Sequence, residues 1–277
     1  MGKCIYCGLK AGFLKRKHKD CETNYLNGKK KIIDNICSTI IQNADFNNLE
    51  NEVNIIAERN YIKTNEIVEL YTKGFDNAVE SFLNDGILTI EEEDKISKFK
   101  THYNFEQDVI DKNGSFQKVL KAAILREILE GKIPETKLNI QGNLPFLLQK
   151  SENVIWIFQN VDFFERRTRT VYQGNSQGVS MRIAKGVYYR VGAFKGNAVK
   201  IEEMKYISKG LIALTNKQIY FASSEKNFKV PYNKIVTVEP FEDGVGIQKD
   251  GANTKPQVFK GLDGWFTYNL ISNLNQM

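Results

Sequence analysis

Three cysteines and one histidine near the start of the chain form two short pairs. Cys4 and Cys7 are separated by two residues, and His18 and Cys21 are separated by two as well. Three thiolates and one imidazole make a ligand set that zinc prefers, and four ligands complete its tetrahedral shell. A complete shell leaves no position for a reacting water molecule, so the pattern predicts structural rather than catalytic zinc.

Local backbone structure must bring these two pairs to one ion. Gly8 directly follows the first pair and permits the tight path of a knuckle, a turn that points both sulfurs at the ion. The second pair, at positions i and i+3, shares one face of a helix that begins there. Cys37 lies among isoleucines at helical spacing, so we expect a small buried residue there. A coincidental grouping of cysteines with a surface histidine is the alternative.

The basic stretch between the two pairs gives the segment a second interpretation. The segment resembles the small zinc knuckles and treble-clef-like fingers of bacterial proteins, which often bind nucleic acid or protein. Lys15, Arg16 and Lys17 would then suit phosphate contacts. The expectation that we favour is that zinc only stabilises a segment too small to fold alone.

Composition sets the frame for the rest of the chain. The proportions of hydrophobic residues (42%) and charged residues (26%) are ordinary, which excludes a disordered chain, a collagen-like repeat and a disulfide-rich miniprotein. A length of 277 residues predicts about two domains. The net charge of +6 is unevenly spread: the chain is basic up to residue 45, acidic from 46 to 150 and basic again from 151 onward. This pattern favours three segments.

The sequence shows no secretory signal and no membrane-spanning run, and this favours a cytoplasmic location. The N-terminus reaches basic residues without the apolar core of a secretory signal, and no apolar run is long enough to span a membrane. We therefore expect a cytoplasmic protein whose clustered cysteines stay reduced and bind metal. The basic end segments could favour nucleic acid, an anionic membrane or an acidic partner. With equal weight, they could instead face the chain's own acidic helices.

The middle of the chain is predicted to be helical. After a zinc knuckle in residues 1–24, apolar residues recur at helical spacing through an acidic helical domain, residues 25–133. The predicted helices lie around 32–41, at 46–57 and 64–82, from 90 onward, and at 116–130. Thr89 and Glu92 form a capping box that predicts the helix start at Ile90. Residues 134–150, with two prolines, are predicted to be a linker.

Residues 151–277 are predicted to form an antiparallel β-domain, because short strand candidates alternate with turn residues. The candidates are 154–158, 163–172, 179–183, 187–191, 204–207, 210–214, 218–222, 227–231, 235–241, 244–249 and 257–259. Asp263 is the expected N-cap of a C-terminal amphipathic helix that carries Trp265, Phe266 and Leu270.

Part of this β-domain resembles bacterial PH/GRAM-like domains. The resemblance rests on Gly210–Phe221, Phe228–Ile235 and Phe241–Val245, which match a pattern of strand, Thr-Asn turn, strand and "I-P-Y-x-x-I". It implies a β-barrel plugged by its C-terminal helix. Together with the predicted zinc knuckle and helical domain that precede it, this gives an α+β fold. Such domains mostly bind phosphoinositides, other anionic lipids or protein segments.

A set of basic residues in the first hairpins is the candidate anion or partner site, because the arginine fork suits phosphate. The set comprises Arg167, Arg169, Arg182, Lys185 and Arg190. The alternative is a solvated basic face that pairs with Glu165. Inositide recognition is the weaker expectation, because bacterial members depart from the eukaryotic lipid-binding pattern.

Motifs for catalysis are missing from the sequence. It contains no G-x-S-x-G, P-loop or H-E-x-x-H pattern, and His102 is the only histidine besides the proposed ligand His18. We therefore expect a non-enzymatic, cytoplasmic bacterial adaptor or regulatory protein with structural zinc. It would engage a partner protein or an anionic surface through the β-domain. The alternative is nucleic-acid binding through the basic zinc knuckle.

Overall fold

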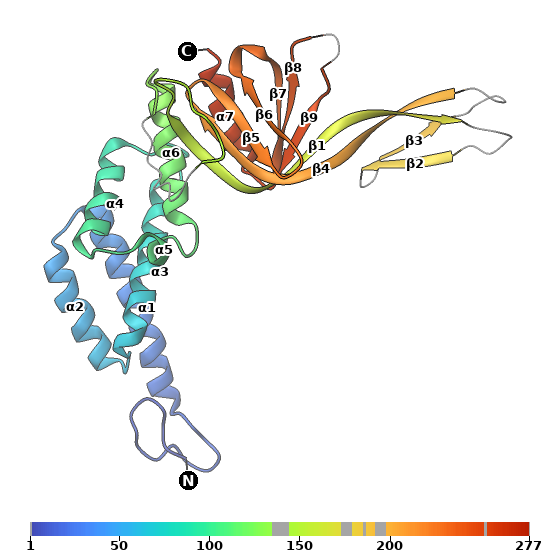
Figure 1. Cartoon of the computed structure of the whole chain (residues 1–277). Coiled ribbons are helices and arrows are strands. Elements are labelled where there is room, and N and C mark those ends of the chain that lie inside the picture. The colour runs from blue at the N-terminus through green and yellow to red at the C-terminus, as the bar shows by residue number, and fades with distance from the viewer. Residues whose placement is uncertain are drawn as a thin grey trace. The chain divides into compact units, whose positions relative to one another are not determined.

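The protein is described by a computed structural model (Figure 1). It describes the chain except residues 1, 135–143, 173–178, 185–186, 192–197, 252–253 and 277, and side chains are also left out within 168–202. The chain divides into two compact units, Met1–Arg126 and Glu127–Met277. The first is helical, and the second contains the strands, so the predicted α+β class is confirmed. None of the described helices has the length and apolarity needed to cross a membrane.

Unit 1 contains the predicted helices. They are α1 (Lys19–Gln42), α2 (Phe46–Arg59), α3 (Thr64–Phe82), α4 (Ile90–His102), the short α5 (Gln107–Ile110) and the start of α6 (Ser115–Leu129). The capping box is confirmed, because the Glu92 amide donates to Thr89 Oγ1 at 3.2 Å and the Thr89 amide donates to the Glu92 carboxylate at 2.9 Å. Among the helices described in unit 1, α5 alone has no counterpart in the predicted set, because four residues are too few for a periodic pattern.

The core of unit 1 forms where α1 crosses α3. Ile32, Ile36 and Ile40 of α1 are fully buried, because helical spacing places them on one face. Gly74 of α3 allows the close approach: a Cβ atom at this position would lie 2.5 Å from the Ile36 side chain. Phe75 stacks on Phe99 with ring centroids 5.9 Å apart, which ties α4 to the same core.

Unit 2 is built on one seven-stranded antiparallel sheet. Its order is β6-β5-β4-β1-β9-β8-β7, and β2 and β3 form a separate hairpin. The strands are β1 (Val154–Tyr172), β2 (Val179–Ala184), β3 (Val187–Val191), β4 (Ala198–Thr215), β5 (Gln218–Ser223), β6 (Asn227–Pro231), β7 (Ile235–Phe241), β8 (Gly244–Lys249) and β9 (Gln257–Lys260). The core between the two ends of the sheet is aromatic, with Phe163, Phe221 and Phe259 fully buried.

The expected closed barrel is wrong for the described residues. The strands β6 and β7 are consecutive in sequence but lie at opposite ends of the sheet, so the sheet stays open. They are joined by a 3₁₀ turn, Tyr232–Lys234. The Tyr232 side chain is buried, and its hydroxyl donates to the Thr215 carbonyl at 2.7 Å. The connection is thus anchored at the β4–β5 turn, and no ladder joins the two strands.

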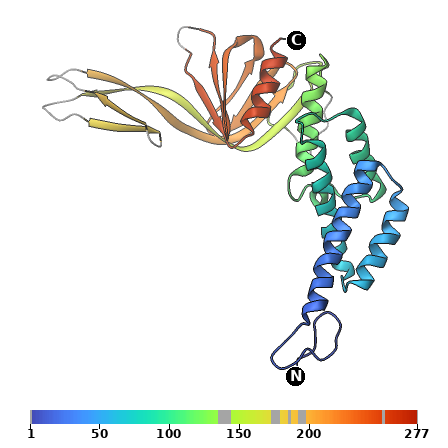
Figure 2. The same ribbon diagram turned by 180° about the vertical axis from the view of Figure 1, so that it is seen from behind.

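Two strands are longer than the sequence indicates. The candidates 154–158 and 163–172 are one strand, β1, and its partner β4 likewise joins 204–207 and 210–214. The β1–β4 register shifts between Phe158 and Val161, and Asn160 there has a positive φ of 59°. Such a bulge interrupts the two-residue alternation, which explains why the sequence divides the strand. Figure 2 shows β1 and β4 running together beyond the other strands of the sheet.

The C-terminal helix is confirmed as α7 (Gly264–Leu274), and Asp263 caps it by accepting from the Phe266 amide at 3.0 Å. Phe266 is buried against Trp156 of β1, with ring centroids 5.1 Å apart. Leu270 and Ile271 are buried on the same face of the helix. The helix therefore covers the sheet with Phe266, Leu270 and Ile271, as the spacing predicts. The prediction is wrong for Trp265, which is 66% exposed and lies off the buried face.

Candidate metal centre and edge-strand groove

Residues 2–18, here called the N-terminal loop, fold back on themselves before α1 begins. The Cys4 amide donates to the Leu9 carbonyl at 2.7 Å, and the Gly8 amide donates to the Cys4 carbonyl at 2.9 Å. Gly8 has a φ of 75°, a conformation that glycine adopts without cost. A tight turn therefore surrounds the first cysteine pair. The second pair lies at the start of α1, with His18 as the N-cap residue.

The structure brings all four predicted ligands together. The ligand atoms of Cys4, Cys7, His18 and Cys21 lie within 4.8 Å of one another. His18 Nδ1 is 3.4 Å from the Cys7 sulfur and 3.6 Å from the Cys21 sulfur. A tetrahedral zinc ion with ordinary bond lengths separates a sulfur and a nitrogen ligand by about 3.6 Å. The four residues are thus close enough to bind a metal ion, in a geometry compatible with zinc.

The imidazole of His18 is oriented by a backbone group. Its Nε2 atom lies 3.0 Å from the Lys10 carbonyl oxygen, which can only accept a hydrogen bond. Nε2 can donate to this carbonyl, and Nδ1 faces the sulfurs of Cys7 and Cys21. Metal-bound histidines are commonly fixed in this way by a carbonyl or carboxylate on the far nitrogen. The arrangement fits a ligand role better than that of a surface histidine.

Backbone amides make the first thiol acidic. Burial alone raises the pKa of Cys4, but N–H groups of Cys7, His18 and Tyr6 donate to its sulfur and outweigh burial. The net pKa is about 6. A thiolate at neutral pH is the form that binds metal. By contrast, burial raises the pKa of Cys37, which lies on α1 outside the cluster. Cys37 packs against the helical core but is only partly buried, less than expected.

Two tyrosines outside the predicted ligand set, Tyr6 and Tyr61, support the site. The Tyr61 hydroxyl hydrogen-bonds to Cys21, an interaction that raises the pKa of Tyr61. The ring of Tyr6, which lies between the first two cysteines, packs on Tyr25 at 4.9 Å and on Tyr61 at 6.4 Å between centroids. The sequence marks Tyr6 only by its position inside the C-x2-C pair. Tyr61 lies in the turn between α2 and α3 and belongs to no sequence pattern.

A polar network beneath these rings connects α1 to α3. Glu66 accepts hydrogen bonds from the Tyr25 hydroxyl, from Lys29 Nζ at 2.8 Å and from the Lys63 amide at 3.1 Å. Burial raises the pKa of Glu66, but these donors outweigh it and lower the pKa to about 2. The network therefore joins α1 to α3 through Tyr25, the residue on which Tyr6 of the N-terminal loop packs.

The basic residues proposed for nucleic acid lie on the same loop. Lys15, Arg16 and Lys17 are exposed. Lys17 forms an ion pair with Glu22 of α1, which removes part of its attraction for phosphate. Lys15 and Arg16 remain on the surface of the loop, and their proposed phosphate contacts stay a prediction.

The predicted basic face of the β-unit can be located only in part. Arg167 of β1 is exposed, 4.0 Å from the Glu165 carboxylate and opposite Glu203 in the register with β4. The carboxylates of Glu165 and Glu203 beside Arg167 favour the alternative interpretation, in which this basic side chain is solvated and paired within the chain. The side chains of Arg169, Arg182 and Arg190, and the whole of Lys185, lie outside the described residues.

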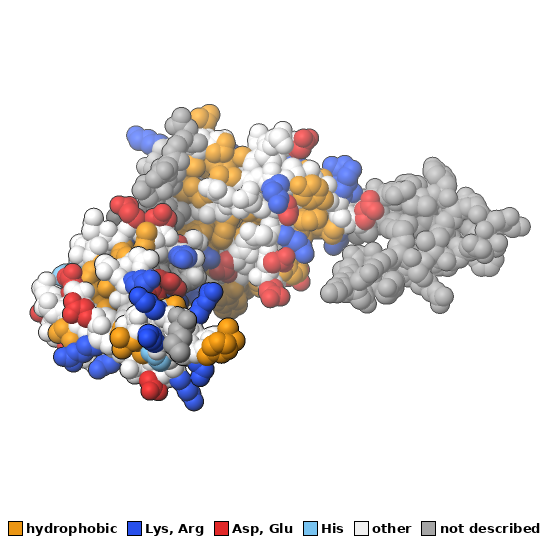
Figure 3. Space-filling view, turned by 90° about the horizontal axis from the view of Figure 1, so that it is seen from below, with side chains coloured by type: hydrophobic (Ala, Val, Ile, Leu, Met, Phe, Trp, Pro, Cys, Tyr) orange, Lys and Arg blue, Asp and Glu red, His pale blue; other side chains and the backbone are white. Residues whose placement is uncertain are grey.

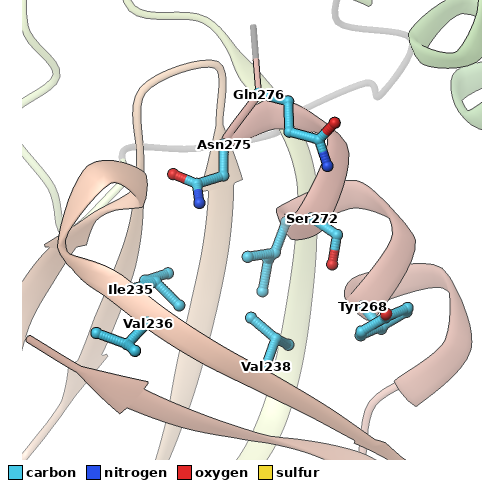
Figure 4. Close-up of a pocket in the computed structure, with 8 residues that line it drawn as sticks. Ile235, Val236, Val238, Tyr268, Ser272, Asn275 and Gln276 are labelled. Carbon is cyan, nitrogen blue, oxygen red and sulfur yellow. The ribbon is translucent and has the colours of Figure 1, made fainter.

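A groove lies between the edge strand β7 and α7. It has a volume of 270 Å³. Its lining residues are Ile235, Val236 and Val238 of β7 with Tyr268, Ile271, Ser272, Asn275 and Gln276 of α7 and its C-terminal end (Figure 4). Val236 is 65% exposed, although it sits in a strand. The groove thus combines an apolar strand edge with polar groups at the end of the helix.

Comparison with known proteins adds no identity to these sites, because the sequence matches no family model and no curated protein.

Proposed function

We propose that this chain is a non-enzymatic cytoplasmic adaptor, with a structural zinc ion in unit 1 and a PH/GRAM-like unit 2 that binds a partner protein. The ligand would be an extended peptide segment that adds to β7 and places its side chains in the groove beside α7. The observation that carries this proposal is the combination of a terminal strand with an adjacent apolar groove.

The antiparallel sheet and the α7 helix packed on it support the PH/GRAM-like assignment, although the sheet is open. The same openness supports peptide binding. A terminal strand offers backbone N–H and C=O groups to a further strand, and a nearby pocket for alternate side chains gives specificity. Pro240 of β7 lacks an N–H group, so it cannot donate to an added strand.

The shape of the groove indicates what such a peptide carries. Val236 and Val238 are two residues apart and both line the groove, together with Ile235, at a register shift of the β7–β8 pair. A partner peptide would therefore carry apolar side chains at positions i and i+2. Ser272, Asn275 and Gln276 would accept or donate hydrogen bonds to its backbone at one end.

A library of random peptides screened against the full chain tests the proposal. We expect enriched peptides with two apolar residues at i and i+2, and we expect Val236→Arg to abolish their binding. Thr237→Arg is the matched control: Thr237 is exposed on the same strand but does not line the groove. Equal binding by both variants, or no enrichment by the unmodified chain, would contradict the proposal.

A further inference from the structure

The N-terminal loop carries a group of apolar side chains that project into solvent. Ile5 is 64% exposed, Leu9 69%, Phe13 81% and Leu14 89%. These four residues are here called the apolar tip. The loop lies at the N-terminal end of α1 (Figure 1), and the space-filling view in Figure 3 shows hydrophobic side chains beside Lys and Arg side chains on the face seen from below.

Folding stability does not account for the two most exposed members of the tip. Phe13 and Leu14 occupy a turn and bury almost none of their surface, so they add little hydrophobic stabilisation. Leu14 also has a positive φ of 58°. An aliphatic residue adopts this left-handed conformation only at a cost, whereas Asn adopts it more readily. An exposed leucine in a strained turn points to a contact outside the chain.

The surroundings of the apolar tip are cationic. Residues 1–19 contain no Asp or Glu. Their basic side chains are exposed: Lys3, Lys10, Lys15, Arg16, Lys17 and Lys19. Apolar side chains at the centre of a basic surface match a lipid bilayer, because the acyl region accepts the former and anionic headgroups attract the latter. Neither feature alone gives stable attachment, but two signals together do.

We propose that the apolar tip inserts into anionic membranes, with Phe13 and Leu14 entering the bilayer and the surrounding lysines contacting headgroups. Nucleic acid fits this surface less well, because the aliphatic chains of Ile5, Leu9 and Leu14 cannot stack on bases as aromatic rings do. The closed Cys3His site below would hold the tip in place, since Cys4 and Ala11 are the only buried hydrophobic residues described in the loop.

Co-sedimentation of the full chain with vesicles tests this proposal. We expect binding to phosphatidylcholine vesicles that contain phosphatidylserine, and little binding to phosphatidylcholine alone. Leu14→Asn should weaken partitioning by about tenfold or more, because a leucine side chain no longer leaves water. The same substitution should leave the melting temperature unchanged or raised, because Asn suits the turn. A loss of binding therefore cannot be attributed to unfolding.

Matched variants separate the contributions. Ile87→Asn removes an aliphatic side chain that is 63% exposed in another loop of unit 1, and it should not change partitioning. Replacing Lys15 and Arg16 by glutamine should weaken binding to anionic vesicles by about fivefold for each charge removed.

The outcomes that overturn the proposal are distinct. It fails if the full chain does not bind anionic vesicles, if neutral vesicles bind equally, or if Leu14→Asn and Ile87→Asn behave alike. Binding to single-stranded RNA without vesicle binding also overturns it and supports the nucleic-acid alternative. None of these results depends on peptide binding at β7.

Discussion

Glu66→Gln is expected to destabilise unit 1 at neutral pH, because Glu66 is the shared acceptor beneath the N-terminal loop. Its pKa of about 2 lies below the ordinary value of 4.5. This difference converts to about 3 kcal/mol of stabilisation at most. The side chains of Lys29 and Glu66 are 25% and 21% exposed, respectively, so solvent screening reduces the figure to about 2 kcal/mol. For a unit of this size, the melting temperature should fall by about 6 °C.

The sign of the pH dependence follows from the lowered pKa. Glu66 contributes its full stabilisation above pH 4.5 and loses it as the pH falls toward 2, because the unfolded state then binds the proton more readily. The gap between the unmodified protein and Glu66→Gln should therefore be largest near pH 7 and close in acid. Circular dichroism at the helical band reports the transition, since the helices lie mostly in unit 1.

Glu69→Gln is the matched control for this experiment. Glu69 lies on the same helix and pairs with Lys73 at 2.7 Å, but both side chains are half exposed. Surface pairs of this kind contribute about 0.5 kcal/mol or less. Equal losses in the two variants, or a loss for Glu66→Gln that does not change with pH, would refute the reasoning.

Three further substitutions have defined outcomes. Gly74→Ala should lower the free energy of unfolding, measured by urea titration, by about 1–3 kcal/mol, because the new Cβ would overlap Ile36. Helix propensity alone predicts the opposite sign. Glu152→Gln should lower the free energy of unfolding of unit 2 by about 2 kcal/mol. The buried carboxylate accepts from Thr215, Gln218 and Tyr220, and an amide cannot accept from all three. Thermal unfolding followed by Trp fluorescence tests this, and an unchanged melting curve would contradict it. Tyr61→Phe should weaken zinc binding by about tenfold in chelator competition, since the hydrogen bond to Cys21 is lost; unchanged affinity would exclude a supporting role.

The parts of the structure that the sequence predicts are those fixed by local spacing. Ile32, Ile36 and Ile40 indicate the buried face of α1 because the helical period is a local property. The capping box at Thr89 and the N-cap at Asp263 are likewise determined within three residues. The metal ligands could be predicted because each pair has the short spacing of zinc ligands, and a single reversal of the chain brings the two pairs together.

The parts that could not be predicted depend on distant segments. Whether the sheet closes depends on pairing between β6 and β7, which lie at opposite ends of the strand order, and no local spacing encodes that pairing. The supporting role of Tyr61 depends on how the α2–α3 turn lies beside α1, and no periodic signal encodes that. The left-handed turn at Leu14 also has no sequence signature, because leucine is not a residue that marks such turns.

X-ray absorption spectroscopy of the purified full chain, combined with metal analysis, tests the central claim most directly. The account predicts about one zinc ion per chain, with three Zn–S bonds of about 2.3 Å and one Zn–N bond of about 2.0 Å. Replacing Cys21 by serine should remove one sulfur from that shell. A chain with less than about half an equivalent of zinc, or a shell that includes an exchangeable water oxygen, would contradict a closed structural site.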